Sequence, residues 1–237
     1  MEMIKVKAVV IAETKFGEND KLLTLFTDTL GAINVSAKGA TSRHNNLKSA
    51  TRFFCYGDFV LYDKKNGYYT ISEVSPITDF MGLSKDVDRL CVASELVKFI
   101  KFSSVENEES KQMQRLLLNS LHFRANTDKN INLVRCIFYI KALFYMGIPP
   151  VMEECAICGG IEDLYCFAPE EGGAICSLCR DSVGYKIPME KAVREFIAFV
   201  LNYPEENSFG IVAENALYEQ IVQTLKIFLK THLSYDI

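Results

Sequence analysis

The segments Cys155-Ala-Ile-Cys158-Gly-Gly160 and Cys176-Ser-Leu-Cys179 each contain a C-x-x-C pair, and 17 residues lie between Cys158 and Cys176. Two pairs at this separation are typical of a zinc ribbon or treble clef, in which each pair lies on a tight turn and four thiolates bind one Zn²⁺. Four cysteines complete a tetrahedral site and leave no position for water or substrate. The spacing therefore predicts one structural Zn²⁺ per chain, bound by Cys155, Cys158, Cys176 and Cys179.

Two other uses of these cysteines stay open, a redox dithiol and a disulfide staple. A redox C-x-x-C usually stands alone near a βαβ unit, and this sequence shows no such unit.

The residues between the two pairs predict a hairpin that returns the second pair to the first. Residues 164–168 and 174–175 have the pattern of two short strands, and Pro169-Glu-Glu-Gly-Gly173 joins them. Gly159 and Gly160 suit a turn in which the backbone needs a positive φ.

The chain has 237 residues, of which 49% are hydrophobic, and a net charge of −4. A chain of this length and composition can bury a substantial core in one to three domains. Since the chain is not basic overall, any nucleic-acid site has to be a local patch.

Cysteine usage and hydropathy predict a cytoplasmic protein with no membrane contact. The sequence has eight cysteines, no signal-peptide pattern and no apolar run near the ~20 residues that span a bilayer. The cysteines outside the two pairs have apolar or aromatic neighbours, so we expect them to be core residues: Cys55, Cys91, Cys136 and Cys166.

Residues 1–80 predict an all-β domain. Strand patterns cover residues 4–12, 21–27, 32–37, 58–63 and 68–74. Five short strands in about 75 residues favour a small closed barrel, of which the OB-fold is the five-stranded Greek-key form.

From Leu83 onward the hydrophobic period is helical. Helices are expected over residues 83–100, 110–125, 132–147, 189–201 and 212–233. Ser84 is the expected N-cap of the first helix, Gly147 the glycine that ends the third, and Pro188 the first-turn proline of the fourth.

The whole pattern predicts an α+β multidomain chain with four parts. They are an OB-fold DNA-binding domain (1–80), the first part of a helical domain (81–152), a zinc ribbon insertion (153–183) and the second part of the helical domain (184–237).

Catalysis finds little support in the sequence. None of His44, His122 and His232 lies in an H-E-x-x-H motif, and no G-x-S-x-G, Walker A or dinucleotide-binding motif is present. We therefore expect a protein that is not an enzyme.

Residues 38–52, here called the basic loop, contain four basic residues and no acidic one. Aromatic residues follow directly, and basic groups beside aromatic rings are how OB-folds hold single-stranded nucleic acid. Residues 1–80 carry ten basic and nine acidic residues, a net charge of +1, which leaves −5 for the remainder. The predicted DNA contacts are Lys38, Arg43, Lys48 and Arg52, with Lys64 and Lys65 added if their hairpin lies on the same side.

An ordinary soluble surface is the other interpretation of the basic loop. Phe53 and Phe54 are adjacent and would point to opposite faces of a strand, so we expect one of them in the core and only the other free to stack on a base.

The whole chain, about residues 1–235, resembles the RecO family of bacterial DNA repair proteins. The resemblance is carried by the opening from Val6 to Thr27 with its Gly-Glu-Asn-Asp turn, and by Leu30-Gly31 with Ala37-Lys-Gly-Ala40. Residues 135–150, an Arg-containing helix that ends in Gly-Ile-Pro-Pro, and the two C-x-x-C pairs also match the family pattern.

The resemblance implies a recombination mediator. Such proteins bind single- and double-stranded DNA, anneal complementary strands and work with RecR and often RecF. They help to load RecA onto DNA covered by single-strand-binding protein, which places them at the nucleoid. Residues 41–46 are less basic here than is common in the family, which would either weaken DNA affinity or make it depend on the helical domain (Arg135, Lys141) or on RecR.

Two further classes stay open. One is an OB-like protein-interaction module with the ribbon as scaffold, which the −5 net charge beyond residue 80 favours. The other is a zinc hydrolase, which would need water or histidine among the zinc ligands.

Overall fold

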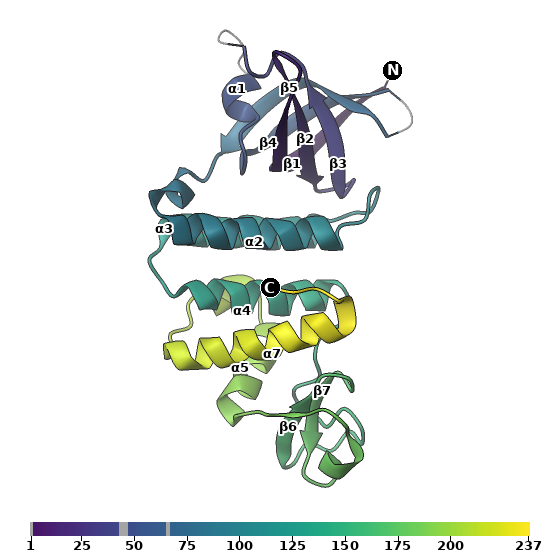
Figure 1. Cartoon of the computed structure of the whole chain (residues 1–237), viewed down its shortest axis with the longest axis vertical. Coiled ribbons are helices and arrows are strands. Elements are labelled where there is room, and N and C mark those ends of the chain that lie inside the picture. Colours follow the sequence, from purple (N-terminus) through teal and green to yellow (C-terminus); the bar gives the residue numbers. More distant parts are fainter. Residues whose placement is uncertain (1, 43–46, 65–66) are drawn as a thin grey trace. The chain divides into compact units, whose positions relative to one another are not determined.

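The computed structural model describes residues 2–42, 47–64 and 67–237, which form two compact units (Figure 1). The first unit ends at Asn126 and the second begins at Thr127. The first contains a five-stranded sheet and two long helices, and the second contains helices and a three-stranded sheet. The predicted α+β class is confirmed, and the predicted four-part domain division stays a prediction.

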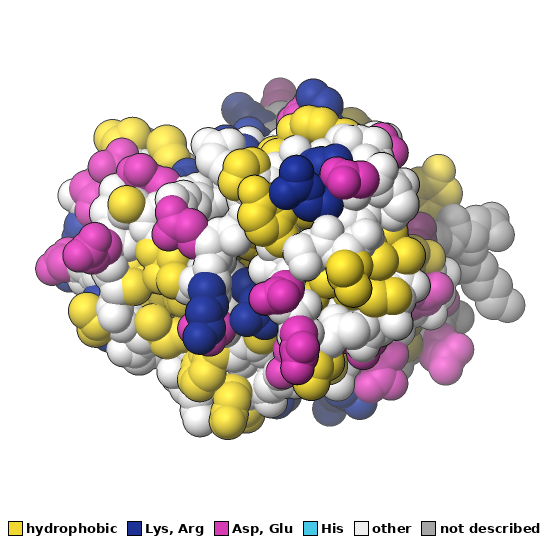
Figure 2. All heavy atoms as spheres, turned by 90° about the horizontal axis from the view of Figure 1, so that it is seen from below, with side chains coloured by type: hydrophobic (Ala, Val, Ile, Leu, Met, Phe, Trp, Pro, Cys, Tyr) yellow, Lys and Arg dark blue, Asp and Glu magenta, His cyan; other side chains and the backbone are white. Residues whose placement is uncertain are grey.

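Charged side chains of both signs are interspersed on the face that Figure 2 shows, with hydrophobic side chains between them. The whole chain has 26 Lys and Arg against 30 Asp and Glu. Neither sign dominates the described side chains of that face, as expected if any nucleic-acid site is local.

The N-terminal sheet closes into a barrel in the order β1-β2-β3-β5-β4, with β4 pairing back to β1 (Figure 1). Only the β3–β5 pairing is parallel within this sheet. All five predicted strands are confirmed, with β1 and β5 longer than expected. Their bounds are β1 Glu2–Phe16, β2 Asp20–Thr27, β3 Ala32–Ala37, β4 Tyr56–Asp63 and β5 Tyr69–Thr78.

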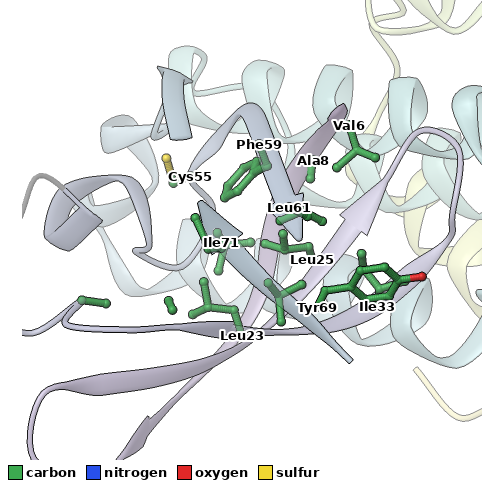
Figure 3. Packing of buried hydrophobic residues seen from close by; sticks show 14 residues of the cluster. Val6, Ala8, Leu23, Leu25, Ile33, Cys55, Phe59, Leu61, Tyr69 and Ile71 are labelled. Carbon is green, nitrogen blue, oxygen red and sulfur yellow. The ribbon is translucent and has the colours of Figure 1, made fainter. Parts of the chain in front are cut away.

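The barrel core is built from residues two positions apart, because side chains alternate between the two faces of a strand. Figure 3 shows such pairs from β2, β4 and β5 pointing toward one another. These pairs are Leu23 with Leu25, Phe59 with Leu61, and Tyr69 with Ile71.

After the barrel, the first unit continues with a short 3₁₀ helix η1 (Met81–Lys85), α2 (Val87–Ser103) and α3 (Lys111–Asn126). The prediction of Ser84 as N-cap is wrong, because Ser84 lies inside the 3₁₀ turn. Asp86 takes that role in an extended conformation, and its carboxylate accepts from Arg89 N at 2.7 Å and Arg89 Nε at 2.8 Å.

The second unit is organised around α4 (Ile131–Tyr145), in which ten of 15 residues are buried. Helices α5 (Lys191–Asn202) and α7 (Asn215–Leu233) pack against it, and α6 (Glu205–Ser208) is a short turn between them. Gly147 follows α4 with φ of +76°, which confirms its predicted role.

A small sheet in the order β7-β6-β8 completes the second unit. Its strands are β6 Leu164–Ala168, β7 Gly173–Cys176 and β8 Ile187–Pro188, with a 3₁₀ turn η2 at Arg180–Ser182. The hairpin predicted between the cysteine pairs is therefore confirmed. The helical role predicted for Pro188 is wrong, because Pro188 pairs with β6 and α5 begins after Glu190.

Among the described residues, no helix is both long enough and apolar enough to cross a lipid bilayer.

Gly31 offers a test of how the β2–β3 turn packs. Its φ is +63°, and a Cβ atom there would overlap the carbonyl oxygen of Val105 in the segment after α2. Gly17 has a similar φ of +65° with nothing within 4 Å of such an atom. Gly31→Ala should lower the free energy of unfolding by more than about 3 kcal/mol, and Gly17→Ala by only about 1–2 kcal/mol. Urea unfolding measures both, and equal losses would contradict this packing.

Candidate metal centre and nucleic-acid interface

The first cysteine pair lies on a tight turn before β6. Cys155 N donates to the carbonyl oxygen of Gly160 at 2.8 Å, and Gly159 N donates to that of Cys155 at 2.9 Å. Gly159 has φ of +71°, as predicted, whereas Gly160 does not have a positive φ. Only one glycine of the two therefore serves the turn conformation.

The second pair begins at the end of β7. Cys179 N donates to the carbonyl oxygen of Cys176 at 3.2 Å, which closes the second turn. Ala156 N donates to the carbonyl oxygen of Ala174 at 2.8 Å and so ties the first turn to β7. Backbone hydrogen bonds therefore hold the two turns together without help from the thiols.

The four predicted ligands lie together. All four sulfur atoms are within 4.8 Å of one another, and the Sγ atoms of Cys158 and Cys176 are 3.8 Å apart. A tetrahedral zinc with Zn–S distances of about 2.3 Å separates its sulfurs by about 3.8 Å, whereas a disulfide bond is about 2.05 Å long. The thiols are free in this structure, so the cluster fits a metal site and the disulfide interpretation is wrong.

The cluster favours thiolate at one position. Burial opposes ionisation of Cys155, but hydrogen bonds from the backbone of Cys176, Cys158 and Ile157 outweigh it and lower its pKa to about 6. Hydrogen bonds to the Cys158 and Cys176 thiols raise the pKa of Cys179 to about 12. The four sulfurs therefore share protons unequally, and a bound cation would take the place of those protons.

The remaining cysteines divide into two kinds. Cys55, Cys136 and Cys166 are buried, as predicted. Burial raises the pKa of Cys55 to about 11, as expected for an inert core thiol. The core prediction for Cys91 is wrong, because this residue lies on the exposed side of α2.

Cys158→Ser and Cys91→Ser form a matched pair for testing the metal centre. Cys158→Ser should reduce bound zinc from about one equivalent to less than about half and expose the 153–183 region to protease, because ligand binding and local folding are one equilibrium. Cys91→Ser should leave both unchanged. Metal analysis and limited proteolysis measure these results, and full zinc retention in Cys158→Ser would contradict the four-thiolate site.

The basic loop is anchored to the barrel near its start and just after its end. Gly39 N donates to the Asp20 carboxylate at 2.8 Å, and Phe54 N donates to the carbonyl oxygen of Val10 at 2.9 Å. A short helix α1 (Leu47–Ala50), which the sequence did not predict, lies within the loop. Arg43 lies outside the described residues.

The structure brings Lys48 and Arg52 together in a cleft of about 510 Å³, here called the barrel cleft. Phe53 also lines it and is partly exposed, whereas Phe54 is 5% exposed. The prediction that one of the two rings is buried is thus confirmed, and stacking of a base on Phe53 stays a prediction. The predicted reason is wrong, because both residues lie in a turn where Phe54 has φ of +68°.

Acidic groups also line the barrel cleft, so its charge balance depends on pairing. Lys21 forms an ion pair with Glu13 and donates to the carbonyl oxygen of Thr51 at 3.2 Å. The charges of Lys21 and Glu13 therefore cancel each other, and the bond from Lys21 stabilises the turn after α1. Asp79 remains as the other acidic residue of the lining, against Lys48 and Arg52.

A second hollow, of about 390 Å³, shares Phe53 with the barrel cleft. Lys98 and Lys101 of α2 line it beside Val97. The sequence analysis missed these lysines. Their spacing of three on one helix face was the available signal, but only the folded unit shows that this face lies beside Phe53.

Lys64 does not lie near the barrel cleft. Asp63 pairs with Glu2 at the start of β1, whereas the basic loop joins β1 at Val10. At about 3.3 Å per residue, those points lie about 26 Å apart along the strand, and Figure 1 shows α1 and the β4–β5 hairpin on opposite sides of the barrel. Lys65 lies outside the described residues.

The other predicted basic positions have different environments. Lys38 is exposed in the turn after β3. Lys141 is 4% exposed and donates to the carbonyl oxygen of Leu201 at 3.1 Å, so it cannot contact a phosphate, and its suggested role in DNA affinity is wrong. Arg135 is partly exposed and donates to Asn132 Oδ1 at 3.1 Å.

These features define an α+β protein with an N-terminal closed barrel and a helical C-terminal region that carries a four-cysteine cluster. Residues 1–80 match the family model "Recombination protein O N terminal", and residues 84–236 match "Recombination protein O C terminal". The chain belongs to the recombination protein O (RecO) family, which confirms the resemblance seen in the sequence.

Curated relatives match over nearly the full length. DNA repair protein RecO of Alkaliphilus metalliredigens is 28% identical, covering 98% of this chain and 94% of the relative. The proteins of the same name from Acetivibrio thermocellus and Clostridium novyi are 26% and 27% identical, covering 98% and 99% of this chain and 93% and 91% of the relatives. All three relatives are named as DNA repair proteins.

The solved aspartyl tRNA synthetase of Entamoeba histolytica is 12% identical with a TM-score of 0.23, covering 62% of this chain and 34% of that chain. This score is too low to relate the two folds.

Proposed function

We propose that this protein is a recombination mediator that binds single- and double-stranded DNA on an OB-type barrel. The observation that carries the proposal is the barrel cleft, where Lys48, Arg52 and the partly exposed Phe53 lie together. Membership of a DNA repair family supports nucleic acid as the ligand. Lys38 and Arg43 are proposed as further phosphate contacts from the sequence, whereas Lys64 and Lys65 are not, because Lys64 lies away from the barrel cleft.

The chemistry of such a site is electrostatic and involves no covalent step. Basic side chains displace condensed counterions from the phosphates, which gives affinity without sequence preference that weakens steeply as salt rises. A base stacking on Phe53 would add about 1–3 kcal/mol and is equally tolerant of sequence. Lys98 and Lys101 extend the same surface past Phe53.

A protein that holds two strands lowers their mutual repulsion and raises their local concentration, which promotes annealing. Within the family pattern, the protein works with RecR and often RecF to load RecA onto DNA coated by single-strand-binding protein. We propose the same role here, in the cytoplasm at the nucleoid.

The cysteine cluster is proposed to hold one structural Zn²⁺, with Cys155, Cys158, Cys176 and Cys179 as the ligands. The metal would supply folding energy to a ribbon, proposed as residues 153–183, inserted in the helical domain. No ligand position is left for substrate in a four-thiolate site, so the metal is not given a chemical role.

Lys48→Glu with Arg52→Glu tests the barrel cleft. The double variant should bind single-stranded DNA at least about tenfold more weakly, and the slope of log K against log salt should fall by about 1.4, the value for two lost phosphate contacts. Fluorescence anisotropy with a labelled oligonucleotide across a salt series gives both quantities.

Lys191→Glu with Lys230→Glu is the matched control, because it makes the same change in net charge at exposed lysines of α5 and α7. Its affinity and slope should stay within about twofold of the wild type. Equal effects of the two double variants would remove the DNA site from the barrel cleft.

The second candidate is a protein-interaction module, favoured by the −5 net charge beyond residue 80. It predicts that the folded, zinc-loaded protein has no measurable DNA affinity at any salt concentration in the same titration.

A further inference from the structure

A groove of about 750 Å³ lies within the second unit, between the small sheet and two helices. Its walls come from Tyr165 of β6, from β8 and the start of α5, and from one face of α7. A volume of this size falls in the range of sites that hold a small ligand or a few side chains of a peptide. The groove lies apart in sequence from every residue proposed to contact DNA.

The floor of the groove is apolar. Met189 and Val193 line it and are buried, and Ile187 lines it and is half-buried. Tyr165 is 57% exposed, which is unusual for a large ring that lines a hollow. An apolar floor with an exposed aromatic wall favours a partner that brings apolar side chains.

The two charged residues of the lining are both acidic. Glu190 and Glu219 line the groove and are exposed. The Glu190 carboxylate accepts a hydrogen bond from Gln220 Nε2 at 2.9 Å, and the Glu219 carboxylate accepts one from the Asn215 side chain. Both donors are neutral amides, so these bonds do not neutralise the negative charge of either carboxylate.

Basic side chains near the groove have partners of their own, although Arg180 reaches Tyr165 in the groove wall. Lys191 lies 3.5 Å from the carboxylate of Glu195 on the same helix. Arg180 lies over the Tyr165 ring at 5.1 Å and donates to the Asp181 carboxylate. Lys186 donates to the carbonyl oxygen of Val183 at 3.3 Å.

The cysteine-rich segment next to the groove is strongly acidic as well. Residues 153–183 contain seven acidic residues and one basic residue, Arg180, a net charge of −6 before any thiolate is counted. Six of the seven are exposed. The acidic residues are Glu153, Glu154, Glu162, Asp163, Glu170, Glu171 and Asp181.

We propose that this groove binds a segment of a partner protein that carries apolar side chains flanked by lysine or arginine. Apolar side chains would fill the floor, and the basic groups would pair with Glu190 and Glu219 at the rim. The negative field of residues 153–183 steers such a segment toward the groove and repels DNA and acidic peptides.

This inference goes beyond the proposed DNA binding, and its test uses no DNA. Three fluorescein-labelled ten-residue peptides share the same three leucines and differ only in four flanking residues, which are lysine, serine or glutamate. The lysine peptide should bind the full-length protein at least about tenfold more tightly than either of the others. Amide hydrogen exchange should show new protection at β8 and the start of α5.

Glu190→Lys with Glu219→Lys should weaken binding of the lysine peptide at least about tenfold. Glu73→Lys with Glu108→Lys is the matched control, because it makes the same charge change at exposed residues of the first unit, outside both the lining and residues 153–183, and it should change affinity less than about threefold. If the first variant is unfolded by circular dichroism, Glu190→Gln with Glu219→Gln replaces it, with an expected loss of about threefold.

Three results would overturn the proposal. One is equal affinity for the three peptides, and another is preference for the glutamate peptide. The third is a wild-type dimer in sedimentation that the Glu190→Lys and Glu219→Lys variant dissociates, which would assign the groove to a second copy of this chain.

Discussion

Strand β1 is the constraint on which the N-terminal unit depends, because it pairs along both of its edges. Its later part pairs with β2 and its earlier part with β4, and the 15-residue strand thereby closes the barrel. Val10 directly follows Ala8 and Val9, the two residues that pair with both neighbours, and lies next to the register shift of the β1–β2 ladder. Its backbone also bonds Phe54 N and the carbonyl oxygen of Cys55, both at 2.9 Å. The same strand that closes the barrel thus holds the end of the basic loop and places Arg52 and Phe53 in one cleft.

The small sheet of the second unit has only a small hydrophobic core, so it depends on other interactions for its stability. Backbone hydrogen bonds bring two turns together, and four thiols then lie at the spacing of a tetrahedral metal site. The charge distribution differs too. Of the three clefts described above, the two that are lined by basic residues belong to the first unit, whereas residues 153–183 of the second carry a net charge of −6. This difference suits a chain that presents one surface to phosphates and another to basic protein segments.

The periodicity of hydrophobic residues and the spacing of the cysteines predicted much of this architecture. Alternation along the strands and the two C-x-x-C pairs are local signals, so the five strands, the hairpin and the cysteine cluster could be predicted from sequence. Features set by tertiary packing could not. Cys91 has apolar neighbours in sequence, but the rotation of α2 exposes it, while Lys141 lies on α4, a helix buried on nearly all sides. Lys98 joins the site only because α2 packs beside Phe53.

The most direct test of the central claim is annealing of complementary oligonucleotides coated with the cognate single-strand-binding protein, measured with and without this protein across a salt series. The account predicts faster annealing that fades as salt rises, because phosphate contacts carry the binding. Folded, zinc-loaded protein that gives no acceleration at any salt concentration, with or without RecR, would contradict it.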